Sequence, residues 1–102
     1  MSLDSEFTHA LEGTIEAARK RGYVPTYFLQ MLAEHGGVET AKRLLAKSEP
    51  QTGLFELWQL NLLHESMEAA VLQDKFHSLF TEAELAEAHR RLEELGYFEK
   101  GK

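Results

Sequence analysis

Apolar residues recur at helical spacing in the first part of the chain. Four of them lie three or four positions apart, so they would share one face of an α-helix. These are Phe7, Leu11, Ile15 and Ala18. We expect the helix to begin near Asp4 or Ser5, because both are favourable N-cap residues. Gly22 suits the left-handed backbone that follows a helix, so the pattern predicts a helix that stops there.

A second and a third helix, joined by a glycine turn, are predicted next. Pro25 suits the first turn of a helix, because the N–H that proline lacks has no helical partner there. The second helix should end at Gly36-Gly37, and the third should run from Val38 to about Lys47. The apolar residues of the second helix are Tyr27, Phe28, Met31 and Leu32, and those of the third are Ala41, Leu44 and Leu45. Together the two form an αα-hairpin.

The middle of the chain combines a loop with a leucine-rich segment. Residues 48–53, which include Pro50, are typical of a loop. Residues 54–63 are apolar nearly all round, which is typical of a buried element. Periodicity alone does not distinguish a helix from a strand over so short a run. The leucine content and the lack of β-branched residues favour a helix.

Local capping signals define the last part of the chain. Ser66 is the expected N-cap of a short helix, and Phe76, Leu79 and Phe80 are expected in a turn or a further short helix. Thr81 and Glu84 have the spacing of a capping box at the start of the last helix. The apolar face of that helix is formed by Leu85, Ala88, Leu92 and Leu95. Gly96 is the expected stop of the helix. Tyr97 and Phe98, which follow it, are expected to fold back onto the core.

These elements predict an all-α fold, a compact bundle of five or six short helices. The 102 residues suffice for one domain, 1–102, in which residues 1–3 and 99–102 are expected to fray. Apolar residues make up 43% of the chain and charged residues 27%, which is typical of a globular protein. The apolar runs are too short to span a bilayer, and the N-terminus has no pattern of a signal peptide. We therefore expect a cytoplasmic protein that does not contact the membrane.

The sequence gives no positive reason to expect an enzyme, a metal or a cofactor. The absence of cysteine excludes disulfides and thiolate metal sites. Glu6 and His9 have the spacing of two ligands on one helix face, but a di-iron bundle needs a second such pair, and Ala86 precedes His89 where a glutamate would be required. No nucleophile motif or phosphate-binding loop is recognisable. Short helices around a small core are also expected to leave little room for a pocket.

The glycine turn is the first of two candidate binding sites. It partly resembles a helix-hairpin-helix motif: Gly37, Ala41 and Leu44-Leu45 match the register of that motif. His35 stands where the motif has its first glycine, and Gly36 where it has an aliphatic residue.

The chemistry of this motif would suit nucleic acid. At Gly36 and Gly37 the backbone N–H groups would approach a phosphate, with Lys42 and Arg43 nearby on the outer face of the third helix. The net charge of −6 disfavours nucleic acid as a partner, because phosphate neutralisation supplies most of that affinity. The alternative is a tight turn between two packed helices, with the basic clusters, including His89-Arg90-Arg91, solvated on polar faces or helix ends.

A longer pattern extends from Gly22 to Leu45. It reads GYVPTYFLQML over residues 22–32, then GG at 36–37, AK at 41–42 and LL at 44–45. In this pattern the chain resembles an uncharacterised family of small bacterial helical domains, over about residues 18–98. Members of that family are free-standing or appended to larger bacterial proteins, some of them nuclease-like. The resemblance implies a portable module for interaction or targeting rather than for catalysis.

Exposed aromatic side chains form the second candidate site, for binding another protein. Tyr23, Tyr27 and Trp58 are the candidates, because amphipathic aromatic residues are enriched at binding hot spots. For Trp58 the alternative is a place in the core. Two functions therefore stay open, a protein-interaction or regulatory module and a nucleic-acid-associated accessory domain. The identity of the partner and the oligomeric state are not specified by the sequence.

Overall fold

The computed structural model describes residues 2–47 and 52–98, and within them the chain is helical and contains no strand. The predicted all-α class is therefore confirmed. The elements are α1 (Leu3–Lys20), α2 (Thr26–His35), α3 (Gly37–Leu45), α4 (Thr52–Gln59), the 3-10 helix η1 (Leu63–Glu65), α5 (Met67–Val71), the 3-10 helix η2 (Asp74–Leu79) and α6 (Glu82–Glu94).

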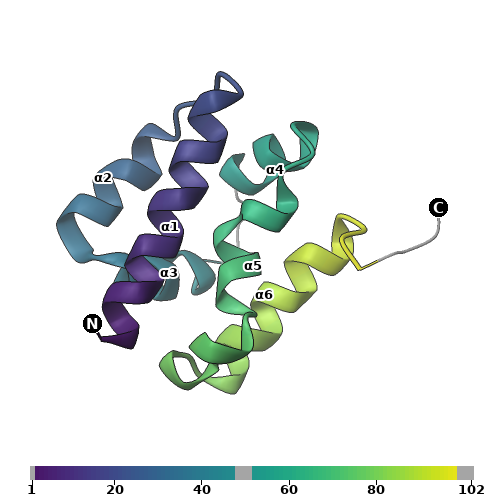
Figure 1. Ribbon diagram of the computed structural model, residues 1–102. Coiled ribbons are helices and arrows are strands. Elements are labelled where there is room, and N and C mark those ends of the chain that lie inside the picture. Colours follow the sequence, from purple (N-terminus) through teal and green to yellow (C-terminus); the bar gives the residue numbers. More distant parts are fainter. Residues whose placement is uncertain (1, 48–51, 99–102) are drawn as a thin grey trace.

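The long helix α1 is the centre of the bundle. It packs mainly against α3 and α5, while α2 packs against α3 and α6 against α5. In Figure 1, α2 lies on one side of α1, α5 and α6 lie on the other, and α3 crosses behind it. The apolar face predicted for α1 is buried at all four positions.

Both ends of α1 are closed by local hydrogen bonds. Its N-cap is Ser2, whose hydroxyl accepts the N–H of Ser5 at 3.1 Å, so the helix begins earlier than the predicted start near Asp4 or Ser5. Gly22 has a φ of 89° and follows the helix as predicted. There the N–H of Tyr23 reaches back to the carbonyl of Ala18 at 3.0 Å, the bond of a Schellman motif.

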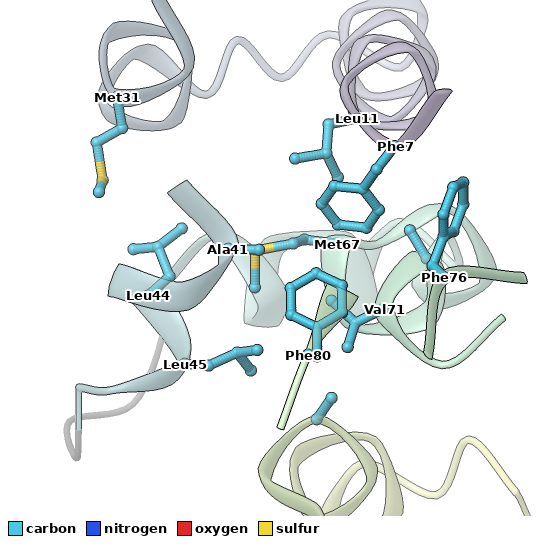
Figure 2. Close-up of a cluster of buried hydrophobic side chains, with 12 residues drawn as sticks. Phe7, Leu11, Met31, Ala41, Leu44, Leu45, Met67, Val71, Phe76 and Phe80 are labelled. Atoms are coloured by element: carbon cyan, nitrogen blue, oxygen red, sulfur yellow. The ribbon is translucent and has the colours of Figure 1, made fainter. Parts of the chain in front are cut away.

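Three aromatic rings, from α1, from η2 and from Phe80 directly after η2, meet in the main core. The ring of Phe7 in α1 makes edge contacts with those of Phe76 and Phe80, both at 5.1 Å between centroids. Figure 2 shows these rings with Leu11 and Val71 packed beside them. The cluster joins α1, α2, α3, α5, η2 and α6.

The predicted caps of α5 and α6 are confirmed. Ser66 accepts the N–H of Ala69 at 3.1 Å. Thr81 accepts the N–H of Glu84 at 3.1 Å, and the Glu84 carboxylate accepts the N–H of Thr81 at 2.9 Å, which completes the capping box. These bonds depend on residues three positions apart, which is why the sequence reveals them.

The leucine-rich segment does not form the single buried helix that was predicted. Helix α4 begins at Thr52, inside the predicted loop, whose residues 48–51 lie outside the described part of the chain. It ends at Gln59, and Asn61 then takes a left-handed φ of 62°. Leu54 and Leu57 are buried, whereas Phe55 and Trp58 lie on a face of the helix that is left exposed.

The end of the chain also departs from its prediction. Tyr97 and Phe98 are exposed and do not fold onto the core. The Phe98 ring instead stacks on that of His89, at 4.3 Å between centroids, along the outer face of α6. Gly96 ends α6 as predicted, with a φ of 79°.

Candidate binding site

The Gly36–Gly37 turn is held by contacts inside the molecule. Gly36 has a φ of 80° and donates its N–H to the carbonyl of Leu32 at 2.9 Å. Gly37 is buried and donates its N–H to the Thr8 hydroxyl at 3.1 Å. A Cβ atom on Gly37 would lie 2.7 Å from the Cα of Thr8, so only glycine lets α3 approach α1 this closely. The two N–H groups that the helix-hairpin-helix motif would offer to phosphate therefore have internal partners.

The two cations of this candidate site also have internal partners. Lys42 contacts Glu84 at 2.8 Å and lies over the Phe80 ring, so its side chain is partly buried instead of lying on the outer face of α3. Arg43 is exposed as expected and pairs with Glu39 at 2.9 Å. Burial alone would raise the pKa of the Glu84 carboxyl, but hydrogen bonds from Lys42 and Thr81 lower it below its usual range. Nucleic-acid binding by this turn stays a prediction.

The Glu6 and His9 side chains have different neighbours. Glu6 lies 3.7 Å from Lys75, and His9 lies 3.4 Å from Glu12. Over residues 2–47 and 52–98, no three histidine or carboxylate side chains stand close enough together to hold a metal ion.

A cleft of about 420 Å³ opens between five helices, contrary to the expectation that the small core leaves little room for a pocket. Its volume lies within the range of small-molecule and peptide sites. The lining residues come from α1, the start of α2, the end of α3, and from α4 and α5. Its apolar walls include Ala18, Phe28, Leu44, Leu54, Leu57 and Met67.

Two of the predicted protein-binding residues, Tyr23 and Tyr27, line this cleft. Tyr27 is 58% exposed at the rim, where the Lys47 ammonium donates to its hydroxyl at 3.3 Å and lies 5.4 Å from its ring centroid. Tyr23 is half-buried, and this burial, together with the charge of Glu56, raises the pKa of its hydroxyl. The structure therefore brings together two tyrosines and a lysine that the sequence analysis did not connect.

Trp58, the third predicted residue, lies outside the cleft and outside the core. It is 43% exposed and stacks on the exposed ring of Phe55, at 5.2 Å between centroids. The interpretation of Trp58 as a core residue is wrong. The reason is that α4 turns Leu54 and Leu57 inward, which leaves Phe55 and Trp58 on a face that no other described element covers.

A buried ion pair closes the inner end of the cleft. Arg91 is only 6% exposed and contacts the cleft residue Glu68 at 3.2 Å and Glu87 at 2.7 Å. It also donates to the carbonyls of Leu44 and Lys47, both at 2.9 Å, and so caps the end of α3. Burial raises the pKa of the Glu68 carboxyl, against the opposing effect of Arg91.

The prediction that Arg91 is solvated as part of the His89-Arg90-Arg91 cluster is wrong, because its side chain is buried against Glu68, which was not predicted as a site residue. One signal was available, because Glu68 and Arg91 lie at helical spacing from Val71 and Ala88 on the inward faces of their helices. A charged residue at such a position predicts a buried pair only when its partner is known. That partner lies 23 positions away in the chain.

Comparison with protein-family models, with curated proteins and with solved structures found no match to the chain. In the described residues, no helix combines the length and the apolar character needed to cross a membrane.

Proposed function

We propose that the protein is a non-catalytic interaction module that binds a partner protein through its aromatic face. We define the aromatic face as Val24, Tyr27, Phe55 and Trp58. The observation that carries the proposal is that all four side chains are large, apolar or aromatic, and exposed. Val24 precedes α2, Tyr27 lies on α2, and Phe55 and Trp58 lie on α4, and both helices border the cleft. Figure 1 shows α4 and the start of α2 at the same end of the molecule.

Physical arguments favour a protein as the partner. Exposed apolar patches on small domains mark binding surfaces, because their burial removes apolar area from water. Tyrosine and tryptophan lose little conformational freedom on binding and still offer a polar atom, so they are frequent at hot spots. The stacking of Phe55 on Trp58 fixes both rings before any partner arrives. We place the module in a bacterial cell, on the basis of the sequence resemblance, and in the cytoplasm, because the chain has no cysteine and no apolar run long enough to span a bilayer.

The glycine turn supports the alternative function less well. Nucleic acid would have to compete with Thr8 for the N–H of Gly37 and with Glu84 for Lys42. The net charge of −6 also disfavours nucleic acid as a partner.

A pull-down from a bacterial lysate, with and without nuclease, tests the proposal. We expect the parent to retain a protein partner that nuclease treatment does not release. Tyr27→Ala and Trp58→Ala should lose that partner without a change in melting temperature, because both side chains are exposed. Tyr97→Ala is the matched control, since it removes a similarly exposed ring outside the aromatic face. Equal capture by all variants, or release by nuclease, would contradict the proposal.

A further inference from the structure

The buried apolar side chains of the described residues form one main cluster and two smaller ones, as is common in small domains. The first and largest contains Leu44 and Met67, the second contains Leu57, and the third contains Leu54. All four residues line the cleft. The cleft therefore lies at the junction of the three clusters, of which the first and the third also share the packed side chain of Leu72.

The walls of this junction are core side chains that keep a small accessible surface towards the cleft, since all four residues are only 5–8% exposed. Apolar atoms that face an open cleft lose both the dispersion contacts and the release of water that burial would provide. A ligand with an apolar body would cover this remaining surface and contact members of all three clusters. Met67 adds adaptability, because its unbranched side chain adjusts to the shape of a guest.

The polar groups of the cleft indicate which polar head group a ligand would have. Glu68 is paired with Arg91, and the Thr14 hydroxyl donates to the carbonyl of Glu65. These groups lie at the inner end and have partners already. At the rim, Lys47 is exposed, its ammonium lies beside the Tyr27 hydroxyl, and it has no carboxylate partner among the described residues. The rim thus offers one positive charge and one hydroxyl side by side.

We propose that the cleft binds a small apolar carboxylate, with the class of medium-chain fatty acids as the simplest example. The apolar body fills the junction of the three clusters, and the carboxylate lies at the rim against Lys47 and the Tyr27 hydroxyl. A cationic guest is disfavoured, because the Lys47 ammonium already occupies the face of the Tyr27 ring at 5.4 Å. This inference does not rest on the protein-binding function proposed above.

Calorimetric titration with three matched probes tests the proposal, with the two ionic probes kept below their micelle concentrations and the uncharged one below its solubility limit. The probes are decanoate, decanol and decyltrimethylammonium, which share a chain and differ in the charge of the head group. We expect one site for decanoate, weaker binding of decanol and the weakest binding of the cation. Octanoate should bind about fourfold more weakly for each methylene it lacks, the ratio that corresponds to about 0.8 kcal/mol per buried methylene.

Two variants connect this binding to the cleft. Lys47→Gln should weaken decanoate about fivefold, which corresponds to about 1 kcal/mol for an exposed charge pair, and leave decanol unchanged. Thr26→Trp places a bulky ring at an exposed position of the rim and should abolish binding of both. Lys75→Gln, which removes an exposed lysine from η2, is the control and should bind as the parent does.

Parent-like melting temperatures would show that the three variants are folded. The proposal is overturned if decanoate does not bind the parent, if Thr26→Trp binds it equally well, or if the cation binds as tightly as decanoate.

Discussion

The glycine turn and the cleft differ in how many of their binding groups already have partners inside the protein. At the turn, the Gly37 N–H is bound by Thr8 and the Lys42 ammonium by Glu84. In the cleft, apolar walls from five helices face an open volume of about 420 Å³, and the ammonium of Lys47 lies at its rim. The turn carries a recognisable residue pattern, and its N–H groups and the Lys42 ammonium have partners within the fold. The cleft has no local sequence pattern, and the side chains around it do not fill its volume.

This difference shows why a binding motif and a packing motif are hard to separate in sequence. Glycine permits the close approach of a phosphate, but it equally permits the close approach of another helix. In this protein α1 takes that place.

The largest effect is expected at Arg91, which holds the inner end of the cleft. Arg91→Ala should lower the free energy of unfolding by about 3–5 kcal/mol, because it leaves Glu68 buried without its partner and removes the cap from the end of α3. Urea unfolding measures the change. Arg90→Ala removes the neighbouring cation, which is exposed, and should have a much smaller effect. Equal losses for the two variants would show that the buried contacts of Arg91 do not hold this region.

A smaller effect is expected at the turn. Gly37→Ala should destabilise the protein by about 1–3 kcal/mol, because the new methyl group would overlap with Thr8 in α1. Gly13→Ala is the matched control, since a Cβ there meets no atom within 4 Å. It should stabilise the protein by about 0.5–1 kcal/mol, the cost of a glycine inside a helix. An unchanged urea midpoint for Gly37→Ala would indicate that the turn is free to move away from α1.

The ion pairs of Glu87 with Arg90 and Arg91 should make the stability of the protein depend on pH. Hydrogen bonds from Arg90 and Arg91 outweigh the opposing effect of burial and hold the pKa of Glu87 at about 2. Its ionised form therefore stabilises the fold above the unfolded pKa of about 4.5, and this contribution is lost as the pH falls towards 2. Burial raises the pKa of Glu68, so protonation of Glu68 acts in the opposite direction.

Comparison with a Glu87→Gln variant isolates the contribution of Glu87. Between pH 5 and pH 2, we expect the parent to lose about 1 kcal/mol more stability than the variant. Thermal unfolding at several pH values measures the difference. Parallel curves for the two proteins would show that Glu87 is not held in its ionised form.

The sequence predicts those features of the fold that depend on residues close together in the chain. The Thr81 and Ser66 caps and the stops at Gly22 and Gly96 are examples, because each involves hydrogen bonds over a few positions. Which helix faces meet is a different question, since it depends on residues far apart. For that reason the buried position of Arg91 was not predicted.

The candidate site was predicted only in part, for the same reason. Tyr23 and Tyr27 were chosen as exposed aromatic residues, and both line the cleft. The cleft itself is space left between five helices, and no periodicity along a chain reports unfilled space. Lys47 acquires its place at the rim only because the end of α3 reaches Tyr27, 20 positions earlier in the chain.

We expect ligands to bind at the cleft and not at the glycine turn, and an amide NMR titration at about 0.15 M salt distinguishes the two sites. Labelled protein would be titrated separately with decanoate and with a short DNA duplex. We expect decanoate to shift the amides of Leu44, Leu57 and Met67 and to leave Gly36 and Gly37 in place, with no shifts from the duplex. Salt-sensitive shifts of Gly36, Gly37 and Arg43 on addition of DNA, together with an unresponsive cleft, would contradict the claim and restore the turn as the binding site.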